Sequence, residues 1–252
     1  MTPLVLHIPH SSTVIPPEIR HQFIVTDKVL DNEIRLMTDH YTDELFVSDD
    51  FKSQAIVFPI SRICVDPERF TDDAQEAMST KGMGVIYTHS HDGTRIRRDL
   101  TETERQWLLD QYFYLHHECL EKMIGDKLKE EGNCLIIDCH SFPREPLPFE
   151  FDQSTDRPDI CIGTDDFHTP QRLMERSVSV FENAGLNVAI NKPFRGSLVP
   201  GKYYRFNDKV LSVMIEVNRK LYLEEDSGIK GENFSNIKTI IRGTLESLQQ
   251  GC

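Results

Sequence analysis

Short apolar runs alternate along the chain with longer stretches in which apolar residues recur every three or four positions. The short runs predict buried β-strands, and the three- and four-residue spacing predicts amphipathic α-helices. The expected strands occupy 3–8, 54–66, 133–140, 159–163, 186–190 and 210–217, where 54–66 holds one or two strands with Pro59 at an edge or bend. The expected helices occupy 27–46, 101–131, 169–183 and 233–248.

The ends of these helices carry their own signals. Thr101 and Glu104 have the spacing of a capping box at the start of the 101–131 helix, and Gly132 follows its end. Pro170 lies in the first turn of the 169–183 helix, and Gly185 stops it. The 27–46 stretch reads as one continuous amphipathic helix because its apolar residues keep helical spacing: Val29, Leu30, Ile34, Met37, Tyr41 and Leu45.

Strands that alternate with helices predict an α/β sandwich around a mostly parallel sheet. No repeat, composition break or low-complexity linker divides the chain, so residues 1–252 are expected to form one domain. The proline-rich stretch 141–157 is too long for a plain connection, and such loops are often functional.

Composition narrows the class of protein. Hydrophobic residues make up 38% and charged residues 27%, which suits a globular chain, and the net charge of −13 argues against a nucleic-acid partner. No apolar run approaches the roughly 18–20 residues of a membrane span, and the N-terminus lacks the features of a signal peptide. The six cysteines form no CxxC pair, so we expect buried, reduced thiols and a cytoplasmic protein.

Candidate catalytic and metal-binding residues lie at or near the expected carboxyl ends of strands, which is where open α/β sheets bind ligands. His10 follows the first strand, Arg62 and Asp66 lie in the 54–66 segment, and His140 follows the strand that also carries Asp138. Asp138 shares a face with His140 and could orient its imidazole. Glu216 stands among apolar residues, where a carboxylate is costly without a partner or a function.

Each of these residues has a plainer alternative. His10 could cap a turn, His89 and His91 read as part of an exposed turn, and at most one of His116 and His117 is expected to face a site. The motifs GxSxG, GxxxxGK[ST], GxGxxG and HExxH are absent, which removes the main signals for serine hydrolases, P-loop proteins, Rossmann folds and zincins.

Five ordered segments, HIPHSS, SRICVDPERF, LIIDCHS, NKPFRGS and MIEVNR, resemble the N-formylglutamate amidohydrolase family. That family is related to zinc carboxypeptidases and aspartoacylase-like deacylases. The resemblance implies a three-layer α/β/α sandwich around a mostly parallel mixed sheet, of the zinc-carboxypeptidase and phosphorylase/hydrolase type. It also implies one catalytic Zn²⁺ per chain, bound by His10, Glu33 and His140, with Glu216 as the catalytic glutamate and Asp138 behind His140.

The same resemblance implies a small anionic N-acyl amino acid as substrate, with N-formyl-L-glutamate, cleaved to formate and L-glutamate, as the best candidate. Arg62 would stabilise the oxyanion. The residues expected to bind substrate are Arg69, Asp66, Asn191, Arg195 and Ser197. This chain has Glu68-Arg69 where relatives often have Asn-Arg, and Gly196-Ser197 where they have Gly-Gly. A related metallo-amidase or carboxypeptidase, and a non-catalytic ligand-binding protein, are the alternatives.

Overall fold

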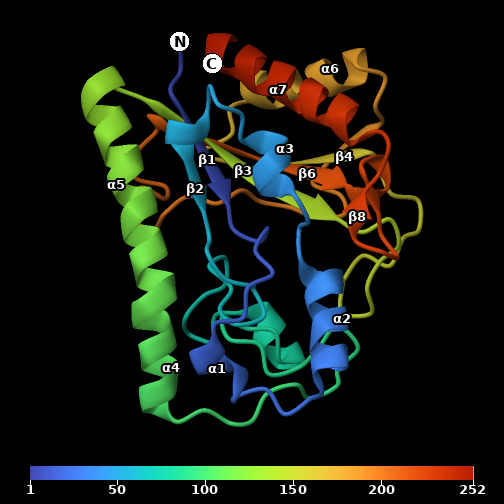
Figure 1. Cartoon of the computed structure of the whole chain (residues 1–252). Coiled ribbons are helices and arrows are strands. Elements are labelled where there is room, and N and C mark those ends of the chain that lie inside the picture. Colours follow the sequence, from blue (N-terminus) through green and yellow to red (C-terminus); the bar gives the residue numbers. More distant parts are fainter. Residues whose placement is uncertain (252) are drawn as a thin grey trace.

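The computed structural model describes residues 1–251, and its centre is a six-stranded mixed sheet (Figure 1). The strands follow the order β2-β1-β3-β6-β4-β5. All neighbouring pairs are parallel except β4 and β6. Their bounds are β1 Leu4–Ile8, β2 Ala55–Val57, β3 Cys134–Phe142, β4 Ile160–Gly163, β5 Val188–Ile190 and β6 Val210–Asn218.

Helices cover both faces of this sheet, which confirms the expected α/β architecture. The α3 helix (Thr42–Phe46), α6 (Gln171–Asn183) and α7 (Phe234–Gly251) pack on one face, together with Leu4, Leu6 and Ile8. The α5 helix (Tyr114–Glu131) covers the other face (Figure 1), where Val5 and Ile136 point. Alternate residues of each strand therefore enter two different cores.

A third apolar cluster lies below the sheet in Figure 1 and holds the long segment 58–100. It is built from α1 (Pro17–Arg20), α2 (Asp27–Met37) and α4 (Glu102–Leu108) with that segment. The capping box of Thr101 and Glu104 is present, and a π-helical turn at Leu109–Phe113 joins α4 to α5. Gly132 ends α5 in the left-handed conformation that glycine adopts without strain.

Two predicted elements differ in the structure. The 27–46 helix is broken at Thr38–Tyr41, where Thr38 is extended and Tyr41 has a φ of 60°. The 54–66 segment contains one strand, within the one or two expected, but this strand (β2) ends at Val57 and turns follow. Both departures occur where side chains of the site are held, because Asp39 lies in the first and Asp66 in the second.

The remaining elements are short. Three 3₁₀ helices occupy Lys52–Gln54, Ala77–Lys81 and Arg219–Leu221. A small antiparallel pair joins β7 (Leu223–Glu224) to β8 (Ile229–Lys230). Among residues 1–251, no helix has both the length and the apolar character needed to cross a membrane.

The expectation of unpaired cysteines is confirmed for the five within the described residues, whereas the expectation of burial is wrong for Cys119. Each of these five is a free thiol, and four of them are buried: Cys64, Cys134, Cys139 and Cys161. Cys119 is exposed on α5. The sixth, Cys252, lies outside the described residues.

Candidate active site

The alternation of side chains along three parallel strands brings the central polar residues to one face of the sheet. In β3, Asp138 and His140 point away from the core that contains Ile137 and Cys139. Strand register pairs His7 of β1 with Asp138, and His140 with Glu216 of β6. These four polar residues therefore lie close together at the carboxyl ends of β1, β3 and β6, on the face that α5 covers.

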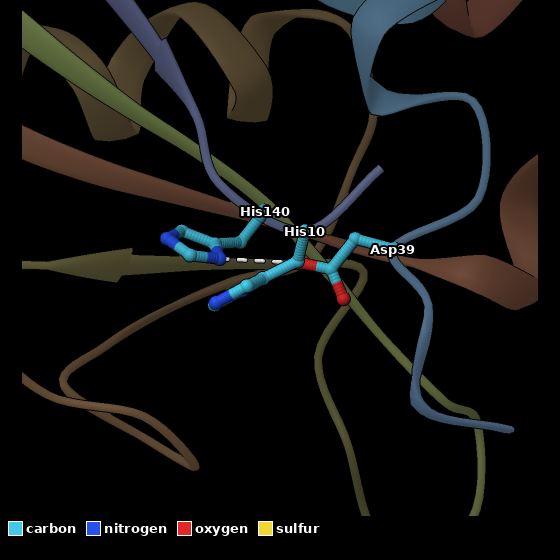
Figure 2. A group of neighbouring side chains, drawn as sticks. All are labelled: His10, Asp39 and His140. Carbon is cyan, nitrogen blue, oxygen red and sulfur yellow. Dashed lines mark hydrogen bonds and ion pairs between the residues drawn. The ribbon is translucent and has the colours of Figure 1, made fainter. Parts of the chain in front are cut away.

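Two histidines and one aspartate from three separate segments form a compact cluster (Figure 2). His10, Asp39 and His140 offer ligand atoms that all lie within 4.8 Å of one another. Asp39 Oδ2 is 3.1 Å from His140 Nδ1 and 3.6 Å from His10 Nδ1. All three residues are almost completely buried. The backbone N–H of Asp39 also donates to the carbonyl of His10 at 3.0 Å, which ties the two segments together.

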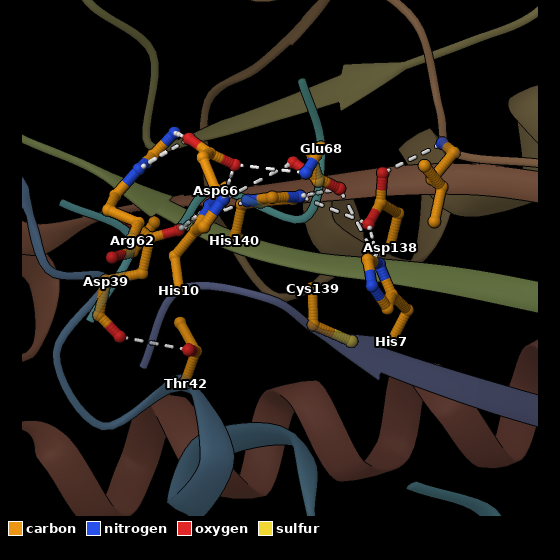
Figure 3. Close-up of polar contacts among 12 residues, drawn as sticks. His7, His10, Asp39, Thr42, Arg62, Asp66, Glu68, Asp138, Cys139 and His140 are labelled. Atoms are coloured by element: carbon orange, nitrogen blue, oxygen red, sulfur yellow. Dashed lines mark hydrogen bonds and ion pairs between the residues drawn. The ribbon is translucent and has the colours of Figure 1, made fainter. Parts of the chain in front are cut away.

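The proton positions in this cluster suit a metal ion. His10 Nε2 lies 2.8 Å from Asp66 Oδ1, and His140 Nε2 lies 3.1 Å from Asp138 Oδ1 (Figure 3). Carboxylates accept hydrogen bonds, so each imidazole carries a proton on Nε2 and turns Nδ1 toward the cluster. The second proton of His140, on Nδ1 beside Asp39 Oδ2, is the one that a metal ion would displace. His10 Nδ1 is buried and has no hydrogen-bond partner among the described residues. Two nitrogens and one carboxylate oxygen form a donor set that zinc accepts.

In this cluster Asp39 carries a negative charge and His140 a positive charge. Burial opposes ionisation of Asp39, but the neighbouring imidazoles of His10 and His140 hold the pKa of its carboxyl well below the usual range. Burial likewise opposes charge on His140, but the carboxylates of Glu68 and Asp138 raise its pKa well above the usual value. A divalent cation would meet ionised Asp39 and would displace the extra proton of His140.

Glu33, expected as the third ligand, does not join His10 and His140. Its carboxylate accepts the backbone N–H of His91 at 2.7 Å and lies 2.6 Å from His91 Nδ1, and burial raises its pKa. Asp39 stands in the expected place instead, because the chain leaves α2 after Met37 and turns toward His10. In one continuous helix Asp39 would have pointed roughly opposite the apolar face, so the spacing gave no sign of it.

Glu216 faces the same space from β6. It is 7% exposed, and its Oε2 has no hydrogen-bond partner among the described residues. Burial raises its pKa to about 8, against the opposing effect of the charged His140. A carboxylate so placed can take up and release a proton near neutral pH.

These residues line a cavity of about 330 Å³ together with Arg62, Arg69, Arg195 and Ser197. Arg62 donates through Nε and Nη2 to Asp66 Oδ2, at 3.1 and 2.8 Å. The buried Nε of Arg69 has no hydrogen-bond partner among the described residues. Arg195 is exposed at the edge of the cavity. The cavity therefore offers cationic groups for an anionic ligand.

Two residues expected to bind substrate lie outside the cavity lining. Asp66 is fully buried and is shared by His10, Arg62 and Tyr87, whose hydroxyl donates to it at 2.9 Å. Asn191 accepts the backbone N–H of Thr164 at 2.9 Å and donates to its hydroxyl at 2.7 Å. Both residues hold the polypeptide around the cavity in place.

The structure gives supporting contacts to four residues to which the sequence analysis assigned no role: Arg219, Glu68, His116 and His117. Arg219 donates to Asp39 Oδ1 at 3.0 Å and to the Leu36 carbonyl at 2.8 Å, so it holds the break after α2. Glu68 Oε1 lies 3.2 Å from His140 Nε2. Both neighbouring histidines of α5 contact residues next to the site. His116 contacts His7, and His117 Nε2 lies 2.8 Å from the Pro67 carbonyl oxygen. Their only sequence signal was their adjacency.

Comparisons with known proteins concern the family and the fold. A profile of the N-formylglutamate amidohydrolase family matches residues 2–223. The fold is similar to that of an N-formylglutamate amidohydrolase from Ralstonia eutropha JMP134, with a TM-score of 0.81, 24% identity and coverage of 99% of this chain and 92% of that one. A gene product of Agrobacterium tumefaciens is similar with a TM-score of 0.71, 18% identity and coverage of 99% and 91%. No curated protein matches the chain.

Proposed function

Since the chain belongs to the N-formylglutamate amidohydrolase family, we propose that it is a zinc-dependent amidohydrolase acting on small N-acyl amino acids. N-formyl-L-glutamate, cleaved to formate and L-glutamate, is the proposed substrate. We further propose that residues 1–252 act as one catalytic domain. The observation that carries the proposal is the cluster of His10, Asp39 and His140 beside Glu216, whose buried Oε2 has no hydrogen-bond partner among the described residues.

The metal would be held by His10 Nδ1, Asp39 Oδ2 and His140 Nδ1. When bound there, zinc supplies a Lewis acid that polarises a carbonyl, lowers the pKa of water and favours the ionised form of a nearby carboxylate. Three protein ligands are typical of a catalytic rather than a structural zinc site. Asp66 and Asp138 support the assignment because each orients one imidazole through Nε2.

Glu216 is the proposed general base. Its carboxylate takes a proton from the attacking water as the new C–O bond forms at the acyl carbon. The same group then delivers that proton to the amine nitrogen as the C–N bond breaks, so one residue serves both steps. Its position opposite His140 in the strand register places it beside the ligand cluster.

Each of the three arginines is proposed to bind a different anionic group of the substrate or of the reaction intermediate. Asp66 accepts from Nε and Nη2 of Arg62, so the remaining N–H groups of Arg62, on Nη1 and Nη2, are proposed to stabilise the oxyanion. The buried Nε of Arg69 lies 3.8 Å from Asp66 Oδ2 and has no hydrogen-bond partner among the described residues, so Arg69 is proposed to bind the substrate carboxylate. Arg195 and Ser197, at the cavity wall, are proposed to contact the second carboxylate.

Metal analysis paired with formate release from a panel of N-formyl and N-acetyl amino acids tests the proposal. Asp39→Asn and Glu33→Gln form a matched pair, because both replace a buried carboxylate by an amide. We expect the wild type to hold about one zinc per chain. Asp39→Asn should lose most of this zinc, and Glu33→Gln should keep it.

The panel also separates the alternatives. Release of amine only from other acyl amino acids or peptides would indicate a related metallo-amidase or carboxypeptidase. A zinc-loaded protein that cleaves none of them would indicate a non-catalytic binding protein.

A further inference from the structure

A line of four buried polar side chains runs from the candidate metal ligand His140 to helix α5. Asp138 Oδ1 is 3.1 Å from His140 Nε2 and 2.9 Å from His7 Nδ1. On the far side of the His7 ring, Nε2 is 2.9 Å from His116 Nε2. His7 is fully buried and His116 is 6% exposed, so each hydrogen bond forms out of contact with bulk water.

Hydrogen-bond chemistry restricts the protons on this line. An ionised carboxylate accepts only, so both His7 Nδ1 and His140 Nε2 donate to Asp138. Burial lowers the pKa of His116 to about 2, so its ring is neutral and carries one proton. Between the two facing Nε2 atoms there is room for a single proton, and a neutral His7 that donates through Nδ1 must accept through Nε2.

We propose that His116 is a positioning residue, whose Nε2–H donates to His7 Nε2 and, together with the Asp138 carboxylate, fixes the ring orientation and the tautomer of His7. His7 then presents its Nδ1–H to Asp138, which is further held by the backbone N–H of Leu198 at 2.9 Å. Asp138 in turn keeps the proton of His140 on Nε2 and leaves Nδ1 as a ligand. This role in metal binding rests on the proposed function, whereas the proton arrangement itself does not.

His7 and Asp138 also belong, with Glu68, to a second group of possible metal ligands, but the contacts of this group argue against a metal site. His7, Glu68 and Asp138 also bring ligand atoms within 4.8 Å of one another. However, His7 Nδ1 and Asp138 Oδ1 are hydrogen-bonded to each other, and none of the three residues has a buried polar atom without a partner in the described chain. By contrast, His10 Nδ1 in the proposed zinc site is an orphan. The arrangement fits a hydrogen-bonded support better than a ligand set.

Nitrogen-15 NMR of the metal-free full-length protein tests the proton arrangement directly, because imidazole tautomers and the imidazolium differ in their ¹⁵N–¹H correlation patterns. In the wild type we expect a neutral His7 with its proton on Nδ1. His116→Phe keeps the aromatic packing against Phe58 but removes the donor, whereas the amide of His116→Gln retains one. We expect His7 to leave the single Nδ1–H pattern in His116→Phe and to keep it in His116→Gln.

Zinc affinity, measured by chelator competition, is the second readout. Loss of an outer-shell partner typically weakens metal binding 10–100-fold, so we expect about 10-fold weaker binding for His116→Phe and rescue by His116→Gln. His21→Phe, on the protein surface, is the control and should change neither readout. Should His116→Phe fail to fold, the wild-type spectrum still decides.

Several results would overturn the inference. One is a wild-type His7 that is an imidazolium or carries its proton on Nε2. Another is a His116→Phe variant with unchanged His7 signals or unchanged zinc affinity. If the wild type binds no zinc, the proposed function fails, and the His7 spectra alone then decide the proton arrangement.

Discussion

Replacement of Glu216 by glutamine separates the proposed base from the proposed metal ligands. Glutamine is nearly isosteric with glutamate, so the packing of the neighbouring Met214, Ile215 and Val217 in β6 should survive. The proposed zinc ligands His10, Asp39 and His140 are untouched. The only change is the loss of a carboxylate that can accept a proton.

The expected loss of activity follows from this role. General acid–base assistance is typically worth 10²–10⁴-fold, so kcat should fall by at least about 100-fold, or roughly 3–5 kcal/mol in the activation barrier. KM should barely change, because Arg62 and Arg69 remain in place. Zinc content should also stay close to that of the wild type.

The same substitution should change the pH dependence of stability in the metal-free protein. Burial raises the pKa of Glu216 from 4.5 to about 8, so between these values the folded state holds a proton that the unfolded state releases. The free energy of unfolding therefore falls as pH rises through this window, by about 1.4 kcal/mol per pH unit. At pH 7 the accumulated cost is about 3 kcal/mol, and Glu216→Gln removes it.

Urea unfolding of both metal-free proteins at several pH values between 5 and 7.5 measures this difference. Because the other titrating groups are common to both proteins, the change in their stability difference with pH reports on Glu216 and on its interactions with His140, Asp39 and Glu68. Glu118→Gln, an exposed change on α5, is the control for both assays. A variant that keeps more than about a tenth of its activity, or that shows the same pH slope as the wild type, would refute the assignment of Glu216.

Three further predictions follow from individual residues. His140→Ala should lose most of its zinc by metal analysis, and full occupancy would remove His140 from the ligand set. Arg69→Ala should raise KM about 10–100-fold in formate-release kinetics, because a hydrogen bond to a charged group contributes about 1.5–3 kcal/mol. An unchanged KM would place the substrate carboxylate elsewhere, and the exposed Arg172→Ala is its control. Thiol titration of the unfolded protein without reductant should find all six cysteines free, and a lower number would show a disulfide.

The elements of the sheet could be predicted because their signals are local. Five of the expected strand regions contain a strand with bounds close to those predicted, and β3 continues two residues further, to Phe142. Period-two alternation in β3 placed Asp138 and His140 on one face, and the isolated carboxylate in an apolar run marked Glu216. The capping box and Gly132 fixed the ends of the long α4–α5 segment for the same local reason.

The break after α2 could not be predicted, because it depends on partners far away in the sequence. Helical spacing continues through 27–46, yet Asp39 leaves the helix to meet His10, His140 and Arg219. Those hydrogen bonds and charges exist only after the strands have assembled. Glu33 stays in the helix and contacts His91 instead, so it lies apart from the pair of histidines with which the sequence reading had grouped it.

The sequence by itself therefore determined the alternating elements, the face of each strand and the family resemblance of its motifs. Tertiary structure decided which carboxylate lies beside His10 and His140 and which residues lie outside the cavity lining. It also decided which residues the two neighbouring histidines of α5 contact. The physical reason is the range of the interactions. Backbone periodicity and capping act within a few residues, whereas a buried charge is stabilised by whichever partners folding brings within hydrogen-bonding distance.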